Sequence, residues 1–325
     1  MSDDELRGQV EGLFSGEDSA PALENLFSDA GAPSPEARGA GHEEQHAPPD
    51  RKSVERGGWW RRILGLRRRM FDRERLTLSL EATEVRLLVA QGQRILHWDR
   101  RPLPAGTLRN GQVVQPDAFG QAVASLIERA NGSRRKVVAS LGGQRSLVRI
   151  LSLPSVPSRL LDGAVRRAAR RELPLPLDEL YFSWQAVGDS GGSRLEVFTV
   201  GVPREVLDSY IVGLHSAGVR PQAMDLKPLA LVRAINLPDV LLADLEAVTE
   251  SVVLVRGFVP YIVRSVALPG EAERPLDERA ENLVVEIQRT LDFYNSTTAA
   301  AHPPWSPTVC LTGALGGEEE VRARV

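Results

Sequence analysis

A pattern of three short strands joined by tight turns occurs twice in this chain, and it limits the fold more than any other feature. The first copy runs from Leu76 to Gly106 and has the turn sequence LEATE at Leu80–Glu84. The second runs from Asp239 to Gly270 and has the turn sequence LEAVTE at Leu245–Glu250. Two such units, roughly 165 residues apart, predict two related lobes with a space between them where a ligand would bind.

The composition fits a soluble protein with two cores. The chain has 325 residues, of which 42% are hydrophobic and 26% charged, with a formal net charge of −3. It contains no apolar run near the ~18 residues that a membrane-spanning helix needs, and its start lacks a signal-peptide pattern. We therefore expect a cytoplasmic protein.

Few residues suggest catalysis or metal binding. The single cysteine, Cys310, excludes a disulfide within the chain and is expected to be a buried strand thiol. The five histidines are scattered, and no nucleophile elbow or Walker-type loop is present. We predict no catalytic residues and no metal ligands.

Charge is divided by region. Residues 1–50 carry twelve acidic and two basic side chains, whereas residues 51–75 carry ten basic and three acidic ones. Residues 1–55 are rich in Ala, Pro, Gly and acid and contain few large apolar side chains, so we expect a disordered tail.

Residues 56–72 form a predicted basic amphipathic helix. Its tryptophans and aliphatic residues share one side and its arginines the other, which is typical of a helix that lies on an anionic membrane surface. Docking on the globular body and nucleic-acid binding are the alternatives; the remaining chain has no net positive charge, so we predict no nucleic acid. The predicted membrane-contacting residues are Trp59, Trp60, Arg61, Arg62, Ile63, Leu64, Leu66, Arg67, Met70 and Phe71.

The middle of the chain separates into a lobe and an insertion. Residues 73–135 continue the first repeat with an amphipathic helix at Pro116–Ala130. Residues 136–223 show a ββαββα order, which predicts an inserted α+β subdomain. Its first two strands, Lys136–Leu141 and Ser146–Leu153, flank Gly142-Gly143, which we interpret as a hairpin turn rather than a phosphate loop.

Residues 224–325 form the predicted second lobe. Helices are expected at Pro228–Ile235 and Asp277–Asn295, and a strand at Thr308–Leu311. A helix that begins at Glu318 and stops at Val325 suggests that this lobe is abridged or that its C-terminal end is missing.

Several segments, taken in order, resemble a known family. They are VRILSLPSVP at 148–157, RRELPLPLDEL at 170–180, HSAGVRPQAMDLKPLALVRA at 215–234 and LVVEIQRTLDFYNS at 283–296. Together, across about residues 75–318, they resemble the PilM family of type IV pilus assembly proteins, which is similar to FtsA. The resemblance implies an α/β, actin-like (ribonuclease H-like) two-lobed fold with an SHS2-like insertion.

The resemblance also implies an ATP·Mg²⁺ cleft with two Asp-Ile-Gly loops, and this chain departs from both. The first loop position holds Ser79, Glu81 and Thr83, the second Asp244, Glu246 and Thr249, and the adenosine-side turn Thr312 and Gly313. A carboxylate beside a phosphate charge costs about 4 kcal/mol per pair at ~4 Å in an effective dielectric of ~20. We expect two tight turns with exposed acids, no cofactor and no ATP hydrolysis; nucleotide binding without hydrolysis is the alternative.

If ATP hydrolysis is lost, the function that the resemblance still implies is that of a scaffold. The family binds the cytoplasmic N-terminal peptide of PilN, a single-pass inner-membrane protein, in a groove that involves the insertion. We therefore expect an adaptor at the inner face of the inner membrane. The alternatives are an ATP-dependent switch, which depends on whether Glu81 and Glu246 point into the cleft, and an FtsA-like membrane-bound polymer.

Overall fold

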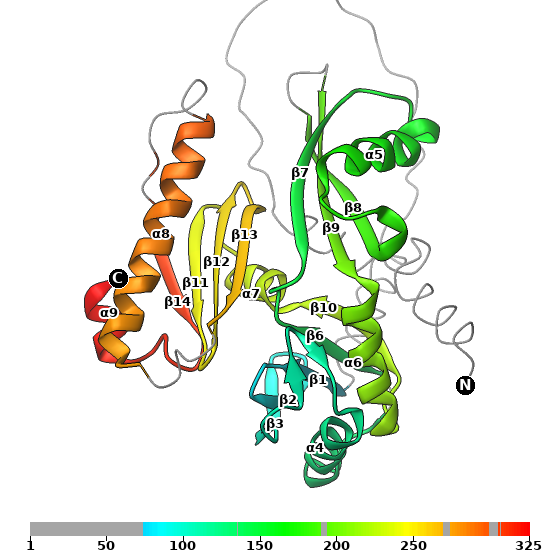
Figure 1. Ribbon diagram of the computed structural model, residues 1–325, viewed down its shortest axis with the longest axis vertical. Helices are drawn as coiled ribbons and strands as arrows, with labels where there is room; N and C mark the ends of the chain where they lie inside the picture. The colour runs from blue at the N-terminus through cyan, green and yellow to red at the C-terminus, as the bar shows by residue number, and fades with distance from the viewer. Residues whose placement is uncertain (1–73, 135, 190–193, 269–273, 299–304, 306) are drawn as a thin grey trace, which may run out of the picture.

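The computed structural model describes residues 74–134, 136–189, 194–268, 274–298, 305 and 307–325. The predicted tail and the predicted basic helix lie outside these residues. The described chain forms two lobes and a third sheet that stands on the first lobe (Figure 1). Within the described residues, no helix is both long and apolar enough to cross a membrane.

The first lobe is a five-stranded sheet in the order β10-β6-β1-β2-β3. The first repeat supplies its antiparallel part, and two later strands pair parallel beside it. Alternate residues of the first two strands are buried, which gives the sheet one apolar face. The bounds are β1 Glu74–Leu80, β2 Glu84–Gln91, β3 Arg94–Pro102, β6 Val137–Leu141 and β10 Pro221–Leu226.

Two helices, α4 (Pro116–Arg129) and α6 (Arg204–Ser216), cover that apolar face. Phe119 of α4 is fully buried and meets the ring of Tyr210 of α6 edge to face at 5.9 Å. A small hairpin of β4 (Leu108–Arg109) and β5 (Gln112–Val113) precedes α4. The helix predicted at Pro116–Ala130 is thereby confirmed.

The second lobe repeats the plan with a four-stranded sheet in the order β13-β12-β11-β14. All six residues of β11 are buried, because one side of the strand packs under α8 and the other packs near α7. The three strands predicted for this repeat are confirmed. The bounds are β11 Val240–Leu245, β12 Thr249–Arg256, β13 Val259–Ala267, β14 Val309–Thr312, α7 Lys227–Ile235, α8 Leu276–Thr298 and α9 Glu319–Arg324.

The insertion is smaller than the predicted ββαββα subdomain. A separate sheet in the order β7-β9-β8 carries helix α5, whereas β6 lies in the first-lobe sheet and α6 packs on α4. The hairpin predicted at Gly142-Gly143 is therefore wrong, since β6 pairs with β1 and β10 while β7 pairs with β9. The bounds are β7 Leu147–Pro154, α5 Ser158–Glu172, η1 Leu177–Glu179, β8 Leu180–Asp189 and β9 Arg194–Pro203.

Candidate functional site

The two repeated turns face each other across the space between the lobes, and they have the same backbone geometry. In the first, Glu81 N–H donates to the carbonyl of Glu84 at 3.0 Å; in the second, Glu246 N–H donates to the carbonyl of Thr249 at 2.9 Å. The residue that follows the third strand of each copy donates a backbone hydrogen bond of 2.8 Å to the turn. In the first copy Leu103 N–H donates to the carbonyl of Thr83, and in the second Leu268 N–H donates to the carbonyl of Val248. The duplication inferred from the sequence thus extends to individual hydrogen bonds.

Both glutamates are buried, so the prediction of exposed acids is wrong. Glu81 is 5% exposed and Glu246 is 4% exposed. Both side chains point into the space between the lobes, where their charge is met by cations of the chain itself. Buried carboxylates persist only with such partners.

The first partner is Lys227, the first residue of α7, which sequence analysis did not single out. Its ammonium Nζ lies 2.5 Å from Glu246 Oε1, 2.8 Å from Asp244 Oδ2 and 3.3 Å from Glu81 Oε1. One ammonium therefore bridges both turns. These four residues, together with Arg86, are called the interlobe cluster below.

The second partner is Arg86 on β2, whose guanidinium crosses from the first lobe to the second. Its Nη1 and Nη2 donate to the two carboxylate oxygens of Glu246 at 2.7 and 2.5 Å, and its Nε donates to Glu84 at 2.6 Å. A bidentate pair of this kind fixes both position and orientation. The lobes are joined by a charged contact in which each group is mostly buried.

The predicted nucleotide-loop residues divide into two groups. Glu81, Asp244 and Glu246 belong to the interlobe cluster, and Ser79 Oγ donates to Glu81 at 2.7 Å while Thr312 Oγ1 donates to Asp244 at 3.0 Å. Thr83 and Thr249 line the adjoining cavity.

Gly313 is required by the backbone rather than by the cavity. Its φ is +90°, and an added Cβ would lie 2.4 Å from the carbonyl oxygen of Leu245. The glycine lets the turn after β14 approach the end of β11.

The surroundings shift the pKa values of the two glutamates in opposite directions. Burial raises the pKa of Glu81, and the attraction of Lys227 only partly offsets it. Burial would also raise the pKa of Glu246, but the hydrogen bonds from Arg86 and the charge of Lys227 outweigh it and hold that pKa below its ordinary value. Burial would lower the pKa of Lys227, but the three carboxylates hold it above its ordinary value.

The residues between the lobes do not fit a nucleoside triphosphate. The cavity there measures about 100 Å³, whereas ligand pockets span roughly 300–1,000 Å³. Its cations already bind carboxylates, and a polyphosphate would have to displace them or face buried negative charge. Within the described residues, no group of His, Cys, Asp and Glu is arranged to hold a metal ion. The residues that line the cavity are Glu81, Ala82, Thr83, Glu84, Arg86, Arg100, Glu246, Ala247, Val248, Thr249 and Ala314.

Comparison with solved structures agrees with this architecture. The chain matches a structure described as the PilM-PilN type IV pilus biogenesis complex with a TM-score of 0.61 and 23% identity, over 76% of this chain and 84% of that chain. It also matches the cytoplasmic domain of EpsL, an inner-membrane component of the type II secretion system of Vibrio cholerae (TM-score 0.43, 18% identity, 60% and 71% covered). A third match, from Bacteroides thetaiotaomicron, is described as having an actin-like ATPase fold (TM-score 0.41, 8% identity, 78% and 88% covered).

Two repeated lobes with turns that meet between them place this protein in the same fold class as the PilM-PilN structure. A family model described as type IV pilus assembly protein PilM matches residues 79–256, which is more than half of the chain. The chain belongs to the PilM family of type IV pilus assembly proteins.

Proposed function

We propose that this PilM-family chain is an adaptor that works without nucleotide and does not hydrolyse ATP. The observation that carries the proposal is the position of Lys227, whose ammonium lies within 3.3 Å of three carboxylates at the place where the family's phosphate loops meet. This internal cation offsets part of the negative charge of the two turns and joins them, which is the work that Mg²⁺ and phosphate perform in an actin-like ATPase. Joining the lobes then needs no ligand.

The test is equilibrium binding of Mg²⁺ and a fluorescent ATP analogue to the full chain, with phosphate release measured in parallel. We expect no saturable binding up to millimolar nucleotide and no release above the buffer rate. Micromolar affinity would contradict the proposal, and affinity without turnover would favour an ATP-dependent switch instead.

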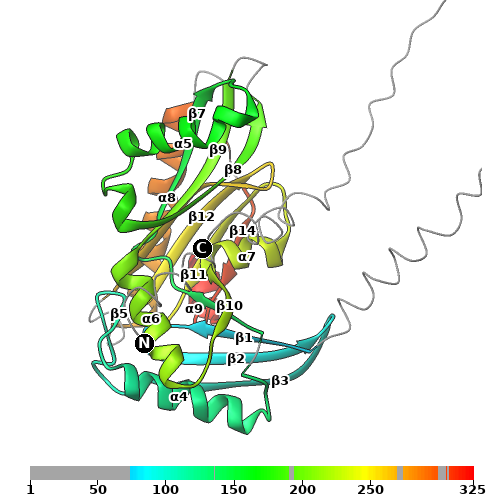
Figure 2. The ribbon, with the colours of Figure 1, turned by 90° about the vertical axis from the view of Figure 1, so that its right-hand side faces the viewer.

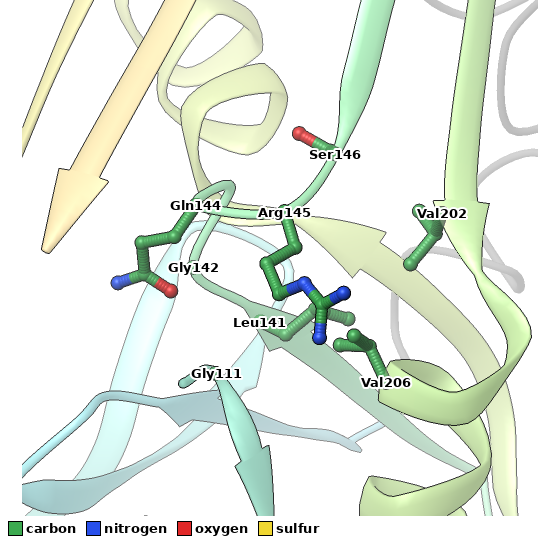
Figure 3. Close-up of a pocket in the computed structure, with 8 residues that line it drawn as sticks. All are labelled: Gly111, Leu141, Gly142, Gln144, Arg145, Ser146, Val202 and Val206. Atoms are coloured by element: carbon green, nitrogen blue, oxygen red, sulfur yellow. The ribbon is translucent and has the colours of Figure 1, made fainter. Parts of the chain in front are cut away.

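The partner we propose is the cytoplasmic N-terminal peptide of a PilN-like inner-membrane protein. The support is the match to a structure described as a PilM-PilN complex. The site we propose is the surface where the insertion joins the first lobe, around a hollow with almost no enclosed volume (Figure 3). Leu141, Val202 and Val206 provide apolar lining, while Gln144 and Arg145 provide polar groups beside it. An apolar surface with polar groups at its edge suits a short peptide that becomes ordered on binding.

Charge reversal at the edge of the hollow tests this site. Arg145 has a side chain that is 38% exposed and pairs with Glu205 at 2.7 Å. Arg134 has a similar exposure, 44%, and pairs with Glu128 at 2.9 Å outside the hollow. We expect Arg145→Glu to weaken binding of the PilN-like peptide about tenfold, with Arg134→Glu unchanged; equal effects of both variants would place the peptide elsewhere.

We further propose that the protein lies at the inner face of the inner membrane and contacts lipid through residues 57–71. The support is the pattern of tryptophans and arginines in that segment. Flotation of the full chain with vesicles that contain phosphatidylglycerol, compared with Trp59→Ala/Trp60→Ala, tests the contact. Equal flotation of the two proteins would exclude it.

A further inference from the structure

Helix α5 carries a strongly basic face on the outside of the insertion. Val165 and Ala169 are buried against the insertion sheet, and the rest of the helix surface is dominated by five exposed arginines. Among them, only Arg166 forms an ion pair with a residue that the structure describes, Asp162 at 2.9 Å, so the other four are available to a partner. The five arginines are Arg159, Arg166, Arg167, Arg170 and Arg171.

Helix α8 carries an acidic face on the outside of the second lobe. It contains five acidic residues and two arginines. Two of the acids, Glu281 and Glu286, pair with arginines of the chain itself. The other three acids, which are exposed and form no ion pair with a described residue, are Asp277, Glu278 and Asp292. Part of the negative charge of α8 is therefore also available to a partner.

Each face exposes an apolar side chain among its charges. On α5, Leu160 is 51% exposed and lies about two turns before Arg167. On α8, Val285 is 45% exposed and lies about two turns after Glu278 and two turns before Asp292. An apolar centre with charged residues around it is the usual composition of a protein–protein interface.

The two faces lie on opposite sides of the molecule. In Figure 1, α8 lies to the left of the second-lobe sheet and α5 to the right of the insertion sheet. In the view turned by 90°, α5 lies in front of the strands and α8 behind them (Figure 2). One molecule therefore cannot join its own two faces, whereas α5 of one copy can meet α8 of another. Their lengths are compatible, since helices of 15 and 23 residues extend about 22 Å and about 34 Å.

Charge complementarity selects one occupant for both faces. A nucleic acid or an anionic bilayer would attract α5 but repel α8, whereas a second copy of the chain offers each face its opposite. We propose that α5 of one molecule binds α8 of a second copy of this chain. Because the contact joins unlike faces, each added copy presents both faces again and further copies can follow. The inference goes beyond the proposed function, because the residues that line the hollow and the cavity between the lobes belong to other elements.

Sedimentation of the full chain at increasing protein concentration tests this contact. We expect the average mass to rise with concentration at about 0.05 M salt, and to rise less at about 0.5 M salt, where surface charges are screened. Arg167→Glu/Arg171→Glu reverses the charge of the α5 face, and Glu278→Lys/Asp292→Lys reverses that of the α8 face. Each variant should weaken self-association about tenfold.

A control and a mixture make the test specific. Arg109→Glu/Arg220→Glu makes the same change in net charge as the α5 variant, at exposed arginines outside both faces, and should associate as the parent protein does. An equimolar mixture of the α5 variant and the α8 variant should recover association, because each reversed face then meets an oppositely charged one.

Three results would overturn the inference. A parent protein that sediments as a monomer at every concentration excludes the contact. Weaker association of the α5 variant alone, with the α8 variant unchanged, would mean that a different acidic surface binds α5. Two weakened variants whose mixture stays dissociated would show that the two faces do not meet. Nucleotide binding and peptide binding are measured separately, so the proposed function stands or falls independently of these results.

Discussion

The turn after β1 and the turn after β11 have the same backbone and the same Leu-Glu-Ala sequence, yet their glutamates have different electrostatic surroundings. Glu246 receives a bidentate guanidinium and a lysine at 2.5 Å. Glu81 receives a serine hydroxyl at 2.7 Å and the same lysine at 3.3 Å. Equivalent positions in a duplicated fold can therefore differ in role: Glu246 joins the lobes, whereas Glu81 is held beside that contact.

The largest effect is expected at the residue that both turns share. Lys227→Met keeps the aliphatic stem but leaves three buried carboxylates without their common cation, which should lower the free energy of unfolding by about 3–5 kcal/mol. Urea denaturation measures the change. Lys136→Met, at an exposed lysine, is the control, and a loss of similar size there would contradict the assignment.

Glu246→Gln should have the next largest effect. The substitution replaces one oxygen of the bidentate acceptor by an amide donor, which then faces the donors of Arg86 or Lys227. We therefore expect the free energy of unfolding to fall by about 2 kcal/mol and the contact between the lobes to weaken. Urea denaturation measures the loss of stability, and limited proteolysis or hydrogen exchange at β11 and β2 measures the weakening of the contact between the lobes. Unchanged exchange would mean that Arg86 holds the lobes through other partners.

Glu81→Gln should have the smallest effect, with a free energy of unfolding within about 1 kcal/mol of that of the parent protein at neutral pH. The amide oxygen still accepts the hydrogen bond from Ser79, and the cost of burying a charge disappears. A destabilisation as large as that of Glu246→Gln would show that the two glutamates are equivalent after all.

The pH dependence of these two variants sharpens the comparison, because their signs are opposite. The folded-state pKa of Glu246 lies below 4.5, so its stabilisation is present above pH 4.5 and is lost as the pH falls through the folded value. The folded-state pKa of Glu81 lies above 4.5, so its charged form costs stability increasingly as the pH rises from 4.5 through the folded value. Unfolding measured from acid to neutral pH should show the deficit of Glu246→Gln growing while Glu81→Gln gains relative to the parent protein. Parallel curves would contradict the opposite shifts.

Local patterns in the sequence predicted the repeats, the turns and the buried strand β11, because each depends on residues that are close along the chain. Lys227 could not be found in this way, since its three acidic partners lie in two different turns and only the folded chain brings them together. The burial of Glu81 and Glu246 was missed for the same reason. The Gly142-Gly143 hairpin failed because a local turn signal does not show which strands pair, and here parallel pairing of β6 with β1 and β10 prevailed.

The position of Lys227 at the start of α7 has a thermodynamic consequence. A metal or nucleotide that joins two lobes stabilises them by mass action, so the contact weakens when the ligand is diluted or chelated. An ammonium that belongs to the chain is present at a fixed ratio of one per molecule. If the proposed nucleotide-free function holds, the joined arrangement should be indifferent to chelators and to the energy charge of the cell, and should respond to acidity more than to ionic strength, because its carboxylates are buried.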